Sequence, residues 1–118
     1  MDELPDIKTG ISKPDLFEKF KLQLQKDFEV AGLNGDFANA LPQNYEEILM
    51  IIGSELEKIN KLAVSKVTGL LYRIDVSEIQ IKKLSAEKKE SSLNGIISEL
   101  ILKRELQKII IKEHFKNK

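Results

Sequence analysis

A chain of 118 residues with 42% hydrophobic and 32% charged residues has the length and composition of one globular domain, not of a disordered segment. It contains no cysteine and a single histidine, His114, which excludes disulfides, thiolate chemistry and Cys- or His-rich metal motifs. The formal net charge is zero, but residues 81–118 hold ten basic against five acidic residues, so positive charge collects in the last third.

The N-terminal residues MDELPDIKTG carry three acids where a secretory or transit peptide would be basic. No apolar run approaches the ~20 residues that are needed to span a bilayer. We therefore expect a cytoplasmic protein that does not associate with membranes. We expect residues 1–11 to be a flexible N-terminal segment and residues 12–118 to form a single helical domain.

The first expected helix begins near Ser12, which stands where an N-cap residue would, followed by Pro14 in the first turn. Apolar residues then recur at spacings of three and four, which predicts one buried face: Phe17, Phe20, Leu24, Phe28 and Ala31. Gly32 is expected to end this helix, because glycine readily adopts the left-handed conformation found after many helices.

The second expected helix begins after Asn44, which forms a capping-box pattern with Glu47 three residues later. Its apolar residues lie on one helical stripe that extends to about residue 63: Tyr45, Ile48, Leu49, Ile52, Leu56, Ile59 and Ala63. This stripe indicates a helix packed on a core along one face.

The stretch LLYRIDVSE, residues 70–78, fits either a strand or the end of a helix. A strand would need a partner, and no second convincing strand is present, so backbone groups would stay unpaired. We therefore predict a helix that ends near Ile74 and a short helix over residues 76–84. Asp75 and Glu78 have the spacing of an N-cap pair for that second helix.

The last expected helix spans about residues 92–115 and is apolar on two sides. Leu93, Ile96, Ile97, Leu100 and Ile101 cluster on one side, and Leu102, Leu106, Ile109 and Ile110 cluster on nearly the opposite side. Such a helix is usually buried between layers, or it extends from its own bundle to meet a partner. The predicted fold class is all-α, a compact bundle of four to five helices with a long C-terminal helix.

The chain has two arginines: Arg73 lies on the border of an apolar stripe, and Arg104 lies in the middle of one. We interpret Arg73 as a structural residue whose stem covers apolar surface while its guanidinium pairs with a carboxylate. Arg104 would need an acidic partner if buried, and Asp75 or Glu78 would tie the last helix to residues 70–80. An alternative interpretation makes Tyr72, Arg73 and Asp75 a small anion- or ligand-binding site.

Arg104, Lys108 and Lys112 could form a basic stripe on the last helix. Cations near a helix C-terminus are also favoured by the helix dipole, and no aromatic residues interleave with these. Together with the zero net charge, this argues against nucleic acid as a partner.

No arrangement of residues typical of catalysis is visible, and Glu113-His114 lacks the second histidine of a zinc-protease motif. We expect no enzyme activity, no metal and no cofactor. The leading hypothesis is a non-catalytic helical module for protein–protein interaction or self-association. Its interface would be Leu102, Leu106, Ile109 and Ile110, with a homodimer as one form. The alternative hypothesis is a nucleic-acid-associated accessory protein that uses the basic C-terminal helix.

Overall fold

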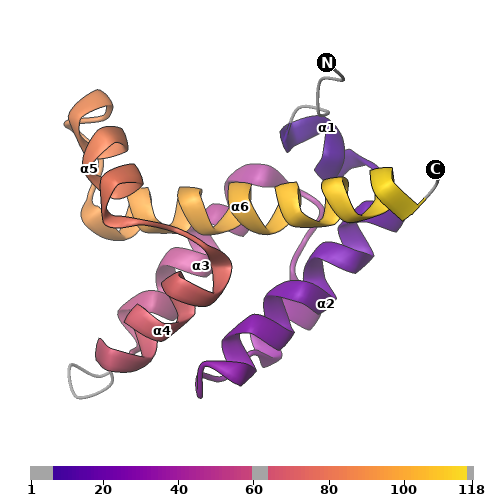
Figure 1. Ribbon diagram of the computed structural model, residues 1–118, viewed down its shortest axis with the longest axis horizontal. Helices are drawn as coiled ribbons and strands as arrows, with labels where there is room; N and C mark the ends of the chain where they lie inside the picture. The colour runs from indigo at the N-terminus through magenta and orange to yellow at the C-terminus, as the bar shows by residue number, and fades with distance from the viewer. Residues whose placement is uncertain (1–6, 60–63, 117–118) are drawn as a thin grey trace.

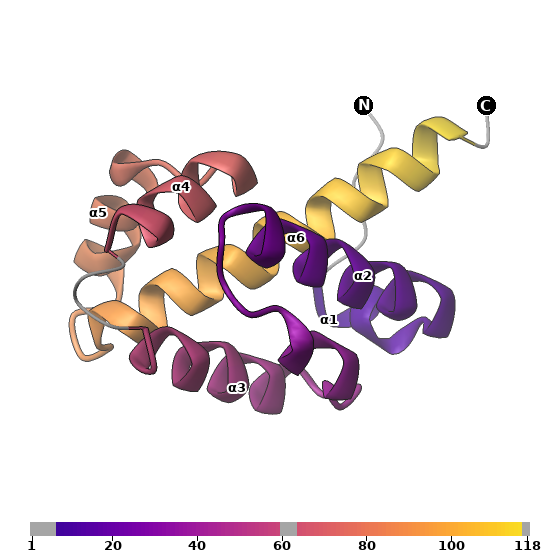
Figure 2. The ribbon, with the colours of Figure 1, turned by 90° about the horizontal axis from the view of Figure 1, so that it is seen from below.

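Helix α6 (Leu93–Lys116) runs through the middle of the molecule in this computed structural model, and the other helices are arranged around it (Figures 1 and 2). The structure describes residues 7–59 and 64–116, which form six α-helices and one 3-10 helix, with no strand among them. Before α6, the elements are α1 (Ile7–Ser12), α2 (Pro14–Val30), η1 (Asp36–Ala40), α3 (Tyr45–Glu57), α4 (Val64–Ile74) and α5 (Glu78–Glu87). The expected all-α fold with a long C-terminal helix is confirmed.

The two apolar faces of α6 are largely covered within the chain, because each of the other five α-helices contacts it, although Leu93 at the start of the helix is 60% exposed. Burial between layers is therefore the arrangement adopted by this helix. The expectation that Leu102, Leu106, Ile109 and Ile110 form an exposed interaction surface is wrong, since all four are buried. The core to which α6 contributes also contains Phe20, Leu24, Phe28, Ile48, Ile52, Leu70 and Ile74.

Helix α1 contributes to the burial of α6. Residues 7–11, which belong to the expected flexible segment 1–11, are helical, and Ile11 is buried; residues 1–6 lie outside the described residues. A Cβ atom at Gly10 would lie 3.2 Å from Cδ2 of Leu106, so the lack of a side chain lets α1 approach α6 closely. Helix α1 thus covers part of the α6 face that the sequence left unpartnered.

Helix α2 buries the predicted stripe of Phe17, Phe20, Leu24 and Phe28. Its N-cap residue is Lys13 and not the expected Ser12, which ends α1 instead. The break falls at Lys13 because Pro14 disfavours a helical conformation in the residue before it, and Lys13 is extended. At the other end, Gly32 adopts φ +84° and the Leu33 amide donates to the Phe28 carbonyl at 2.9 Å. This is the expected glycine stop.

Helix α3 starts as predicted, with the Asn44 side chain accepting a hydrogen bond from the Glu47 amide at 3.0 Å. Ile48, Ile52 and Leu56 are buried along the predicted stripe. The helix ends at Glu57, earlier than expected, and residues 60–63, which include the end of the predicted stripe, lie outside the described residues.

The stretch from residue 70 to residue 78 is the end of α4 followed by the start of α5, so the helical interpretation is confirmed. Asp75 has φ +71°, with the Val76 amide bonded to the Leu71 carbonyl at 2.8 Å and the Asp75 amide to the Tyr72 carbonyl at 3.1 Å. Asp75 therefore ends α4 in the way Gly32 ends α2.

The capping box of α5 is formed by Ser77 and Gln80: the Ser77 amide donates to Gln80 Oε1 at 2.8 Å, and the Gln80 amide donates to Ser77 Oγ at 3.2 Å. The expectation that Asp75 and Glu78 cap this helix is wrong. With Asp75 already in the left-handed stop, the first extended residue able to cap the next helix is Ser77.

Candidate functional site

A buried cluster of charged side chains joins α2, α4 and α6. Its centre is Asp27 on α2, which is fully buried and accepts hydrogen bonds at Oδ1 from Arg73 Nε (2.6 Å) and Gln23 Nε2 (3.0 Å). Lys108 Nζ lies 3.4 Å from the other oxygen, Oδ2. A buried charge needs such pairing, because an unpaired carboxylate in a low-dielectric interior is strongly destabilising.

The pKa of Asp27 is set by opposing effects. Burial raises it, and hydrogen bonds from Glu105, Gln23 and Arg73, together with the positive charge of Lys108, lower it by more. The net pKa of Asp27 lies below its ordinary value, so Asp27 is the ionised acid of the cluster.

Glu105 on α6 is the second acid, with 0% of its surface exposed. Burial raises its pKa to about 9, with further contributions from its hydrogen bond to Asp27 and from the charge of Asp27, against a smaller opposing effect of Lys108. At neutral pH Glu105 is therefore protonated. The protonated carboxyl of Glu105 donates through one oxygen to Asp27, and Lys108 Nζ lies 3.6 Å from Glu105 Oε1.

The cluster is poorly placed for acid–base chemistry on a substrate. Neither carboxyl is exposed, and the adjoining surface groove is lined by Gln23 and by neither acid. A catalytic acid must come within hydrogen-bonding reach of the group that it protonates. The arrangement instead pins three helices together, since Arg73 and Lys108 reach Asp27 from 46 and 81 residues away in the sequence.

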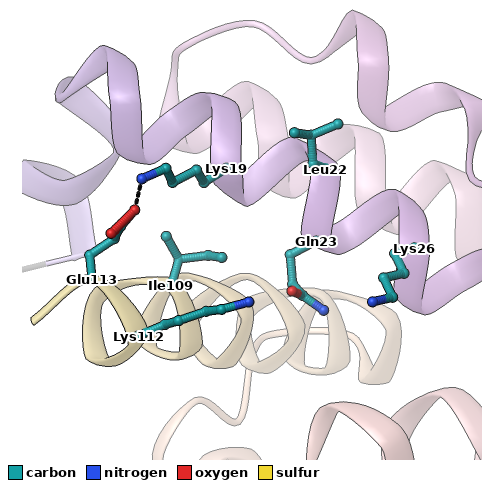
Figure 3. A pocket seen from close by; sticks show the side chains of 7 residues that line it. All are labelled: Lys19, Leu22, Gln23, Lys26, Ile109, Lys112 and Glu113. Atoms are coloured by element: carbon teal, nitrogen blue, oxygen red, sulfur yellow. Dashed lines mark ion pairs between the residues drawn. The ribbon is translucent and has the colours of Figure 1, made fainter. Parts of the chain in front are cut away.

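The surface groove lies between α2 and the C-terminal half of α6 and holds about 290 Å³ (Figure 3). Ile109, only 5% exposed, forms its floor, and Leu22, 63% exposed, stands on the rim formed by α2. The other lining side chains are Lys19, Gln23, Lys26, Lys112 and Glu113. Lys19 and Glu113 form an ion pair across one end of the groove, between its two walls.

The sequence-predicted arginines are both paired with acids. Arg73 bonds to Asp27, a partner that the sequence did not identify. Arg104 Nη2 donates to Asp75 Oδ2 at 3.1 Å, so the tie between the last helix and residues 70–80 uses Asp75. Glu78 is exposed in the first turn of α5 and has no such bond to Arg104.

The alternative ligand site at Tyr72, Arg73 and Asp75 is not assembled. Arg73 is engaged with Asp27 and Asp75 with Arg104, while Tyr72 is 88% exposed. A shallow hollow beside α4 is lined by Tyr72 and Arg73 without Asp75. The three side chains thus do not converge on one point.

The basic stripe of α6 is largely neutralised. Arg104 pairs with Asp75 and Lys108 turns inward to Asp27, while the neighbouring Lys103 lies 3.6 Å from the Glu99 carboxylate. Lys112 is exposed on the groove. The expectation that Lys108 belongs to a solvent-facing basic stripe is therefore wrong, because the buried carboxylate of Asp27 draws its ammonium inward.

Sequence reasoning missed Asp27, Glu105 and Leu22. The sequence contains a signal for each of the three residues, because each one departs from the alternation of apolar and polar residues along its helix. Asp27 and Glu105 are acids beside buried apolar neighbours on helical stripes, and Leu22 is an apolar residue off the buried stripe of α2.

Among the described residues, no group of three or more His, Asp or Glu side chains is placed to hold a metal ion. No helix in the same part of the chain is long and apolar enough to cross a membrane. Comparison with protein-family models, with curated proteins and with solved structures found no match.

Proposed function

We propose that this chain is a non-catalytic module that binds another protein through the groove between α2 and α6. The observation that supports it is the exposure of Leu22 beside the apolar floor at Ile109. A single exposed leucine is ordinary on a protein surface, but one that borders a groove with an apolar floor and basic rims has the composition of a binding site.

A binding role fits the chemistry of the acids better than a catalytic one. Glu105 and Asp27, the two fully buried acids, interact with one another and with cations inside the core. Glu99, whose pKa is lowered despite the opposing effect of burial, pairs with Lys88 at 2.7 Å. Each of these acids has a structural partner, which leaves none assigned to a substrate.

A different protein is favoured over a second copy of the chain. The apolar residues first considered for a homodimer, on α6, are buried. In a two-fold dimer through the groove, the same patch would face itself, and Lys26 and Lys112 of the two copies would come together. Like charges placed together across an interface oppose association.

Capture from a lysate of the source organism, read by mass spectrometry, tests this function. We expect a protein to be retained by the wild-type chain and lost by Leu22→Ser. The matched control is Ile79→Ser, which removes another exposed apolar side chain, on α5 and outside the groove. Both variants change exposed residues and should keep the helical fold.

Two results would count against the proposed function. One is a wild-type chain that retains no protein above background, and the other is a protein retained equally by Leu22→Ser. Proteins lost on nuclease treatment would instead favour the nucleic-acid alternative, and that association should weaken steeply as salt rises.

A further inference from the structure

The groove between α2 and α6 carries an excess of positive charge beside its apolar residues. Three of its lining side chains are lysines and one is a glutamate. Glu113 is already paired with Lys19, whereas Lys26 and Lys112 are exposed and have no ion pair with another described residue. The groove therefore presents two uncompensated cations to any occupant.

These two lysines come from opposite walls. Lys26 extends from α2 toward α6, and Lys112 lies along α6 with its ammonium on the side of Gln23 (Figure 3). The apolar contacts at Leu22 and Ile109 lie in the same groove. An occupant that fits must therefore bring apolar side chains and acids together on one short segment.

An amphipathic helix meets these requirements. The groove is formed by two packed helices, and a third helix can seat its ridge of side chains in such a groove. Its backbone groups are bonded internally, so it brings no unpaired donor or acceptor against Ile109. Strand addition, the main alternative for a peptide, needs an open sheet edge, and the described residues contain no strand.

We propose, building on the interaction function above, that this groove binds an acidic amphipathic helix of a partner protein. Apolar side chains of that helix pack on Leu22 and Ile109, and its flanking Asp or Glu residues pair with Lys26 and Lys112. The Lys19–Glu113 pair closes one end of the groove and limits how far the partner helix extends.

A displayed library of helical peptides about 16 residues long tests the partner class, a length at which an isolated helix is marginal but attainable. The peptides carry leucine at i, i+4 and i+7, with the flanking positions free to be acidic, basic or neutral. We expect selection on the wild-type chain to enrich acidic flanks.

A synthetic peptide from that selection should bind the double variant Lys26→Glu/Lys112→Glu about tenfold or more weakly, because two attractive surface pairs become repulsive. The matched control is Lys82→Glu/Lys83→Glu on α5, which makes the same charge change at two exposed lysines outside the groove. This control should bind the peptide as the wild type does. Circular dichroism should show unchanged helix content in both double variants.

Three results would overturn the proposal: enrichment of basic or neutral flanks, no enrichment, or equal binding by the two double variants. If a random single-stranded DNA oligonucleotide bound the wild type and lost affinity in Lys26→Glu/Lys112→Glu while no peptide was enriched, the lysines would serve nucleic acid instead. These three results differ from the result that would contradict the proposed interaction function. That function fails if Leu22→Ser retains the same lysate proteins as the wild type.

Discussion

Replacing Glu105 by Gln should stabilise the protein at neutral pH and remove a large part of its pH dependence. The unfolded chain releases the Glu105 proton near the ordinary value of 4.5, whereas the folded chain keeps it up to a pKa of about 9. Between these values the folded state binds the extra proton, so the free energy of unfolding falls as pH rises. The contribution of Glu105 to the free energy of unfolding is complete only below about pH 4.5, where the unfolded chain is protonated as well.

The size of the effect follows from the displaced pKa. Each pH unit within the window lowers the free energy of unfolding by about 1.4 kcal/mol, which gives roughly 3 kcal/mol at pH 7. Gln cannot ionise, and its amide can still donate to Asp27. We therefore expect Glu105→Gln to match the wild type near pH 4.5 and to exceed it by roughly 3 kcal/mol, or about 10 °C in Tm, at pH 7.

Thermal and urea unfolding at several pH values between about 5 and 8 would measure this difference. Asp27 and Glu99 act in the opposite direction but at lower pH, because their lowered pKa values make stability fall only as the medium becomes acidic. The control is Glu90→Gln, which makes the same substitution at an exposed residue. If Glu105→Gln kept the wild-type slope of stability against pH, Glu105 would not be the protonated acid and the interpretation of the cluster would be wrong.

Two further predictions concern the charged residues that hold the helices in place. Asp27→Asn should lower the free energy of unfolding by about 3 kcal/mol, because Arg73 and Lys108 lose their shared partner. Urea unfolding would measure this loss of stability. A loss below about 1 kcal/mol would contradict the role of Asp27 in holding the helices together. Asp75→Gly should be more stable than Asp75→Ala by about 1 kcal/mol. Both variants lose the ion pair with Arg104, but only glycine adopts the φ of +71° without steric strain. Equal Tm values for the two variants would show that this backbone conformation is unstrained.

The helices were predictable where a continuous apolar stripe was bounded by a recognisable cap or stop. Asn44 and Gly32 are such signals, and both act as expected. Helix α1 has only six residues, too few for a repeating stripe, and its place is set by contact with α2 and α6. Asp75 was misassigned because Asp is common at N-caps, while a left-handed stop usually carries Gly.

The sequence signals buried acids at Asp27 and Glu105, but it does not predict which distant residues meet them in the cluster. The positions of Asp27, Arg73 and Lys108 on their own helices follow from periodicity, but their meeting depends on how three helices cross. Periodicity fixes which face a residue occupies and not which distant residue it opposes. Arg73 was correctly expected to need a carboxylate, and only the packing of α2 against α4 identifies that carboxylate as Asp27.

The cluster and the groove are linked through Gln23, which donates to Asp27 with its side-chain amide while it lines the groove. The contacts that bury Asp27 also bring α2 against α6, and these two helices form the walls of the groove. Lys108 on α6 contacts Asp27 on α2 directly, and Arg73 on α4 bonds to the same carboxylate, so buried interactions help to set the spacing of the two walls. A groove held in this way costs little ordering on binding, and preorganisation of this kind favours affinity in a small, shallow site. Binding energy would then come from the residues at the surface of the groove, chiefly Leu22, while the buried acids act on it only by holding the two helices together.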